Sequence, residues 1–219
     1  MSAGLNLVSE SALQFFGKMN ASISHEINNV LAIINENAGL LEDVALMEEK
    51  GVPLESEKIK KISGKVLGQV KRANRIIKNM NRLAHSVDES VKMVDIADAL
   101  EFMIVLSSRL SAIKGVSFKT VSHPDRIEIF TNPFLLQNII WFCLDYIMNL
   151  AERDTTISIA VEEHGGAVQI RFSGISGLVD IKNYAFPAEQ ETRLLETLNG
   201  ELQINSNNRE IILFLSAHP

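Results

Sequence analysis

The sequence predicts two domains of different classes, α + α/β overall: a long helical hairpin over residues 1–90 and a two-layer α/β sandwich over residues 91–219. Two observations predict the hairpin. Apolar residues recur at steps of three and four along the first half, which indicates the buried face of a helix, and Gly51-Val52-Pro53 breaks this pattern once. Short apolar runs alternate with helical segments after Val91, which predicts the sandwich.

The two helices of the hairpin are expected over about Ser9–Glu49 and Glu55–Asp88, longer than an average globular helix. The apolar stripe of the first consists of Phe16, Met19, Ile23, Ile27, Val30, Ile34, Leu41 and Val44. That of the second consists of Ile59, Ile62, Val66, Val70, Ala73, Ile77, Met80, Ala84 and Val87. Because one hairpin cannot cover both stripes, two hairpins are predicted to form a four-helix bundle, and the chain to be a homodimer.

The second half is expected to contain three helices and six strands. The helices are Asp95–Ile113, Asn132–Ala151, which Asn132 caps and Pro133 begins, and Glu189–Leu198, which ends at Asn199-Gly200. The strands are Val116–Val121, Ile127–Phe130, a hairpin of Ile157–Val161 and Ala167–Phe172, and the closing pair Leu202–Asn205 and Ile211–Leu215.

Composition excludes several classes of function. The net charge of −6 over 219 residues disfavours nucleic acid as a partner, because phosphate binding needs concentrated Lys and Arg. Cys143 is the single cysteine, which fits a reducing compartment, and we expect a cytoplasmic protein. The N-terminus lacks the pattern of a signal peptide, and no apolar run reaches the length of a membrane span, so no membrane partner is expected.

The segment from Ser24 to Asn29 carries the most informative chemistry. His25 lies two positions from both Ile23 and Ile27, and each residue advances a helix by about 100°, so His25 faces away from the apolar stripe. Glu26 flanks it, and Asn29 lies one turn further on. A neutral imidazole is a good nucleophile near neutral pH, a carboxylate can support its developing charge, and an amide can hold a water molecule.

Other interpretations of His25 remain open on these residues alone. A lone exposed histidine on a helix is usually just solvated. Zinc binding by H-E-x-x-H requires histidine at both ends, and Asn29 occupies the second end. No metal site is therefore expected, and His85, His123, His164 and His218 also lack ligand spacing.

The segment Ser24-His25-Glu26-Ile27-Asn28-Asn29, preceded by Phe15–Met19 and followed by Leu31–Ile34, resembles the phosphoacceptor box of HisKA-type sensor histidine kinases. Those domains dimerise as four-helix bundles. The resemblance implies that His25 is phosphorylated, that Glu26 assists the transfer and that Asn29 positions a hydrolytic water. Val30 stands where many members have a proline that bends the helix.

The second half is similar in layout to the ATP-binding domain of the same family, but its motifs are eroded. Phe142 and Tyr146 stand where the family has two metal-binding asparagines. Ser173–Gly177 lacks the adenine-reading aspartate, and no carboxylate follows until Asp180. The second glycine-rich motif and the lid are missing, since only Ile181–Glu189 precedes the last helix. The resemblance thus implies a degenerate ATP-binding domain that uses no cofactor.

The expected function is that of a dimeric histidine phosphotransferase in a two-component phosphorelay. His25 would exchange a phosphoryl group with the receiver aspartate of response regulators without using ATP, so receiver domains are the expected partners. One alternative is a response-regulator phosphatase or adaptor, which would form no phosphorylated His25; another is a divergent kinase, which would bind nucleotide. The basic residues of the second helix, among them Lys71, Arg72 and Arg75, form either a solvated face or a contact with an acidic receiver.

Overall fold

The computed structural model describes residues 2–121, 126–180 and 186–216. The chain divides into two compact units. One comprises residues 20–84, and the other comprises the first 19 residues together with residues 85–219. Within the described residues, no helix is both long and apolar enough to cross a bilayer.

Residues 20–84 form a hairpin of two antiparallel helices, as the sequence predicts. Helix α1 (Ser2–Glu49) contributes the part after Met19, and α2 (Ser56–Ala84) returns after the turn. Gly51 has a φ of 83°, and its N–H donates to the carbonyl oxygen of Glu48 at 2.8 Å. Glycine adopts this left-handed conformation without the steric cost of a side chain, so it ends α1 here.

The buried side chains of the hairpin repeat every seven residues. On α1 they are Ile23, Val30, Asn37 and Val44, with Ser22 buried beside Ile23, and on α2 they are Ile62, Ile76 and Leu83. A seven-residue repeat is typical of helices that pack side by side like a coiled coil. Within one hairpin, Val70 and Ile77 of the predicted α2 stripe are each 42% exposed, whereas Ile76, which the stripe did not include, is buried against α1.

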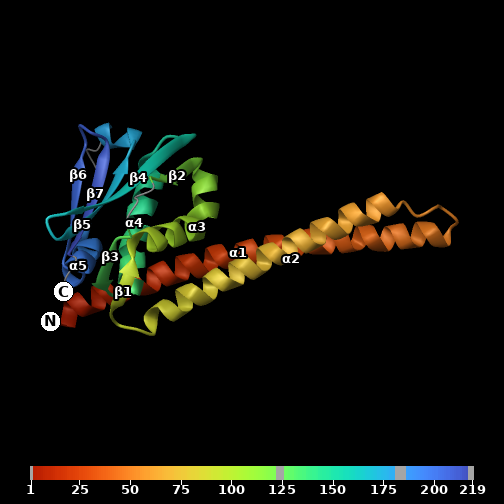
Figure 1. The fold of residues 1–219 in the computed structure, drawn as a ribbon, viewed down its shortest axis with the longest axis horizontal. Coiled ribbons are helices and arrows are strands. Elements are labelled where there is room, and N and C mark those ends of the chain that lie inside the picture. Colours follow the sequence, from red (N-terminus) through yellow and green to blue (C-terminus); the bar gives the residue numbers. More distant parts are fainter. Residues whose placement is uncertain (1, 122–125, 181–185, 217–219) are drawn as a thin grey trace. The chain divides into compact units, whose positions relative to one another are not determined.

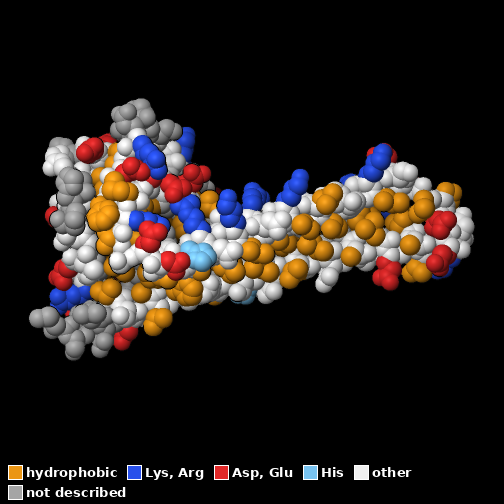
Figure 2. Space-filling view, turned by 60° about the horizontal axis from the view of Figure 1, so that its bottom comes forward, with side chains coloured by type: hydrophobic (Ala, Val, Ile, Leu, Met, Phe, Trp, Pro, Cys, Tyr) orange, Lys and Arg blue, Asp and Glu red, His pale blue; other side chains and the backbone are white. Residues whose placement is uncertain are grey.

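Much apolar surface of the hairpin stays uncovered. Figure 2 shows hydrophobic side chains in a band along the helices, with lysines and arginines beside it. The larger exposed apolar residues are Leu31, Leu40, Leu46, Met47, Val52, Leu54, Leu67, Val70 and Ile77.

The other unit contains a mixed five-stranded sheet in the order β2-β4-β5-β7-β6 (Figure 1). The strands are β2 (Val116–Thr120), β4 (Thr155–His164), β5 (Ala167–Ser173), β6 (Gly200–Asn205) and β7 (Glu210–Ser216). Only β2 and β4 pair in parallel; the other pairs are antiparallel. The predicted strands and helices all occur here within a few residues of their expected ends.

Three helices, α3 (Ile96–Lys114), α4 (Pro133–Leu150) and α5 (Glu189–Thr197), complete the two-layer α/β arrangement. Short 3-10 turns follow α2 at His85–Val87 and β5 at Ser176–Asp180. A second, two-stranded sheet pairs β1 (Lys92–Asp95) with β3 (Glu128–Thr131). The sequence did not predict β1, because four residues with one exposed apolar side chain form no recognisable strand pattern.

Side-chain caps fix where α3 and α4 begin. Asp95 accepts a hydrogen bond from the N–H of Asp98, and Asn132 accepts one from the N–H of Leu135 at 2.9 Å. Burial acts to raise the pKa of Asp95, but its hydrogen bonds from the Asp98 N–H and from Arg126, at 2.8 Å, outweigh burial and hold that pKa below its usual value.

The first 19 residues belong to the core of the sheet-containing unit, through contacts with α4. Ser11, Phe15 and Met19 are fully buried. The Phe15 and Phe134 ring centroids lie 5.6 Å apart, and Asn138 Nδ2 donates to Ser11 Oγ at 3.2 Å. The sequence placed Phe16 in the buried stripe, but Phe16 is only half-buried, because this part of α1 packs on α4 instead of following the stripe of the hairpin.

Candidate functional site

Helix α1 presents His25 and Asn29 to solvent and partly buries Glu26. His25 and Asn29 are both exposed, on the side opposite buried Ile23 and Val30. The Glu26 side chain is 17% exposed. The spacing of residues in the sequence therefore gave the correct face for His25 and Asn29, while Glu26 turns toward the neighbouring helix.

Arg72 of α2 is the partner of Glu26. Its Nη2 atom lies 3.6 Å from Glu26 Oε2, and its own side chain is 44% exposed. Among the described residues, no side chain hydrogen-bonds the His25 ring. The site thus combines an accessible imidazole, a carboxylate fixed by a cation on a second helix, and an amide one turn away. Such a set can accept a phosphoryl group and hold a water molecule near it.

Sequence reasoning missed the pairing of Arg72 with Glu26. Arg72 stood out only as one of nine basic residues on α2, and nothing in its local pattern distinguishes it from Lys71 or Arg75. Glu26 and Arg72 are 46 positions apart in the chain. Their contact depends on how α1 and α2 pack together, which a single sequence does not reveal.

The aromatic residues Phe142 and Tyr146, predicted to fill the eroded nucleotide pocket, lie on α4. Both are half-buried, and the Tyr146 ring stacks on Phe186 with centroids 4.1 Å apart. On the same helix Trp141 is buried, with Lys18 Nζ 6.0 Å from its ring centroid, and Lys18 also pairs with Asp145 at 3.7 Å. The Asp180 side chain and residues 181–185, part of the short segment that stands where the family has its lid, lie outside what the structure describes.

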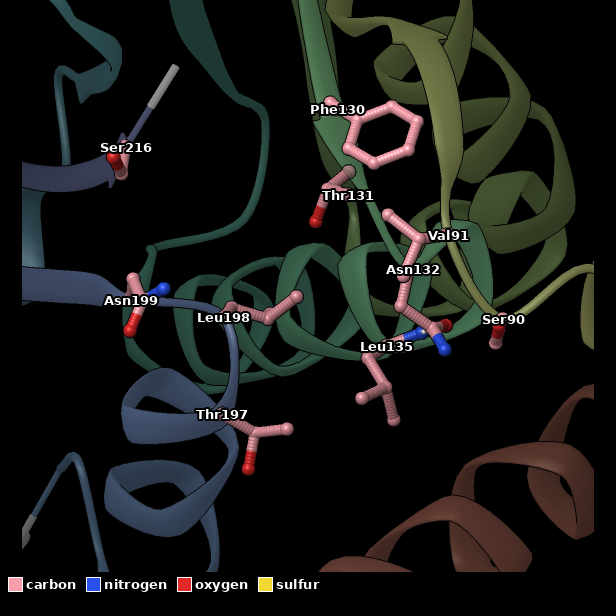
Figure 3. A pocket seen from close by; sticks show the side chains of 10 residues that line it. All are labelled: Ser90, Val91, Phe130, Thr131, Asn132, Leu135, Thr197, Leu198, Asn199 and Ser216. Carbon is pink, nitrogen blue, oxygen red and sulfur yellow. Dashed lines mark hydrogen bonds between the residues drawn. The ribbon is translucent and has the colours of Figure 1, made fainter. Parts of the chain in front are cut away.

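A hollow of about 210 Å³ lies elsewhere in this unit (Figure 3). Its walls come from the residues just before β1, the β3–α4 junction, the end of α5 with the two residues after it, and the end of β7. All ten lining residues are neutral: Ser90, Val91, Phe130, Thr131, Asn132, Leu135, Thr197, Leu198, Asn199 and Ser216. Such a lining offers no cation or carboxylate to hold a triphosphate and its metal ion.

The remaining titratable candidates that the structure describes form no further cluster. Within the described part of the chain, no three His, Cys, Asp or Glu side chains gather as metal ligands. His85 Nδ1 pairs with Asp88 at the surface at 2.7 Å, while His123, His218 and the His164 side chain lie outside the described residues. Burial raises the pKa of the Cys143 thiol far above its usual value, which makes the thiol unreactive.

Comparisons with known proteins show similarity of structure alone. No protein-family model matches the chain, and no curated protein matches it. The histidine kinase AdeS of Acinetobacter baumannii is 11% identical and is matched over 88% of this chain and 98% of its own, with a TM-score of 0.47. A histidine kinase of Burkholderia phymatum is 12% identical over 87% of this chain and 99% of its own, with a TM-score of 0.45.

The histidine kinase ThkA is also matched, both as its catalytic domain and in a complex. Its catalytic domain is 8% identical over 60% of this chain and 99% of its own, with a TM-score of 0.48. ThkA solved in complex with the response regulator TrrA is 14% identical over 94% of this chain and 63% of its own, with a TM-score of 0.44. These neighbours are all histidine kinases or their catalytic domains, and at such identities the similarity assigns no role to any residue of this chain.

Proposed function

We propose that this chain is a histidine phosphotransfer protein that exchanges a phosphoryl group between His25 and the receiver aspartate of response regulators. The observation that carries the proposal is the arrangement on α1 and α2. An exposed imidazole lies next to a carboxylate that Arg72 holds, with the Asn29 amide one turn away. Transfer of label from a phosphorylated receiver domain to His25 tests it.

The chemistry of the step follows from the side chains present. A ring nitrogen of neutral His25 attacks the phosphorus of an aspartyl phosphate, the phosphorus–oxygen bond to the aspartate breaks, and the aspartate leaves as a carboxylate. The proton on the other ring nitrogen stays there, and Glu26 stabilises the positive charge that develops on the ring. The reverse sequence returns the phosphoryl group to a second receiver.

The exposed apolar residues of the hairpin support a homodimer through residues 9–90. Exposed side chains such as Leu67, Val70 and Ile77 lie on α2, and a second hairpin packed against them would bury them in a four-helix bundle. Light scattering at micromolar concentration is expected to give twice the chain mass. Replacing Leu67 and Ile77 together by Lys should shift the protein to monomer, whereas a stable monomer of the parent protein would contradict the dimer.

Asn29 is expected to act in dephosphorylation more than in transfer. Its exposed amide can orient a water molecule but is a poor base. Asn29→Ala should slow loss of phosphate from the receiver by about tenfold while the rate of label transfer to His25 changes less than twofold. Phosphate release and labelling are measured in the same reaction, with exposed Asn35→Ala as the control variant; equal loss of both rates would mean that Asn29 is structural.

The proposal excludes ATP as the phosphoryl donor. Two features support this: the aromatic residues at the expected metal-binding positions of α4, and the glycine-containing turn without an adenine-reading aspartate. Without ligands for the metal ion, the charge that develops in transfer stays unneutralised. Calorimetry with Mg·ATP should show no micromolar binding, and γ-labelled ATP should leave His25 unlabelled; binding together with labelled His25 would make the chain a kinase.

A further inference from the structure

The ion pair between Arg72 and Glu26 links α2 to the residue beside the phosphoryl acceptor. We propose that Arg72 is a positioning residue, which holds the Glu26 carboxylate next to His25 and affects phosphoryl transfer only through Glu26. This inference rests on the proposed function, because it assigns a role within the same site.

Burial makes Glu26 dependent on its partner. With 17% of its side chain exposed, Glu26 is largely withdrawn from water, and a withdrawn carboxylate needs a compensating cation or donor. The Lys60–Glu57 pair of α2 gives the contrast. Its side chains are 73% and 88% exposed, and pairs at such exposure contribute little. Removing Arg72 would therefore leave the Glu26 carboxylate without its cation and free to change its side-chain conformation.

The ion pair with Arg72 does not use up the hydrogen-bonding capacity of Glu26. The 3.6 Å separation of Arg72 Nη2 from Glu26 Oε2 is an ion-pair distance, longer than the usual N–H···O hydrogen bond. The oxygens of Glu26 thus keep lone pairs that can accept a hydrogen bond from the His25 ring. Because charge rather than a bidentate hydrogen bond makes the contact, lysine should replace Arg72 better than a neutral residue does.

The competing role for Arg72 is a direct contact with the incoming receiver or its phosphoryl group. Arg72 is half-exposed and lies among other basic residues of α2, so both roles predict slower transfer when it is removed. They differ in one respect. A positioning residue loses its effect when Glu26 is already neutral, whereas a docking residue keeps its effect.

A double-mutant cycle on the full chain separates the two roles. The measurement is the single-turnover rate of label transfer to His25 from the receiver domain that labels the parent protein fastest, over a range of receiver concentrations. The variants are Arg72→Gln, Glu26→Gln, the double variant and Arg72→Lys, with exposed, uncharged Asn81→Ala of the same helix as the control. Circular dichroism of each variant checks that the helices are retained.

We expect Arg72→Gln to lower the maximal rate about tenfold without raising the receiver concentration needed for half-maximal rate. The double variant should be no slower than Glu26→Gln, Arg72→Lys should recover most of the parental rate, and Asn81→Ala should stay within about twofold. A further tenfold loss in the double variant, or a parental rate in Arg72→Gln, would overturn the positioning role and leave the proposed function standing. If the parent protein accepts no label from any receiver, the phosphotransfer assignment fails first, and the role of Arg72 fails with it.

Discussion

Phe15→Ala is expected to destabilise the sheet-containing unit by about 3–5 kcal/mol. The Phe15 ring is fully buried, and its centroid lies 5.6 Å from that of Phe134 at the start of α4. Removing it leaves a cavity and abolishes the aromatic contact, and both changes cost free energy. A loss of this size is a large part of the stability of an ordinary domain.

Urea unfolding measures this effect directly. Trp141 is the only tryptophan, is buried, and lies in the same unit, so its fluorescence reports the unfolding of that unit. Leu13→Ala, two residues away on α1 with 73% of Leu13 exposed, is the control and should change the free energy of unfolding by less than about 0.5 kcal/mol. Equal midpoints for Phe15→Ala and the control would show that the start of α1 is not part of this core.

That result would also decide where the two units divide. We expected one domain to cover residues 1–90, whereas the contacts in the structure group the first 19 residues with residues 85–219. The pattern of Phe15, Phe16 and Met19 fits one continuous amphipathic helix, and a helix of 48 residues contains no signal at the point where its packing partner changes. Only the tertiary contacts of Ser11 and Phe15 with α4 reveal the change.

Elements with strong local signals could be predicted. Asn132 followed by Pro133 marked the start of α4, Gly165-Gly166 marked the turn between β4 and β5, and Gly51 marked the end of α1. Elements that depend on distant partners could not be predicted. β1 exists because it pairs with β3, more than 30 residues away, and the register of α2 depends on which of Ile76 and Ile77 meets α1.

The same distinction holds for the candidate site. Helical periodicity predicted the exposed face shared by His25 and Asn29, since both positions follow from the spacing of Ile23, Ile27 and Val30. The partner of Glu26 could not be predicted, because it comes from the packing of α2 against α1. The resemblance implies that Glu26 assists transfer to His25, and the structure shows in addition that Arg72 pairs with Glu26.

Replacing His25 is expected to have the largest effect on function. The imidazole is the best nucleophile near neutral pH in this segment of α1, and Glu26 and Asn29 cannot form a stable phosphorylated product in its place. His25→Ala should therefore abolish labelling, with a loss of more than about 100-fold in transfer rate. Because the His25 side chain is exposed, its removal should leave the unfolding midpoint nearly unchanged, which separates loss of chemistry from loss of fold.

The most direct test of the account compares two phosphoryl donors on the same preparation. One arm uses a panel of receiver domains phosphorylated with radiolabelled acetyl phosphate, and the other uses γ-labelled Mg·ATP. The parent protein and His25→Ala are assayed in parallel, and labelled histidine is identified by its acid lability. We predict label on His25 of the parent from at least one receiver, none from ATP, and none on His25→Ala. Label that appears from ATP, or equally on His25→Ala, would contradict the account.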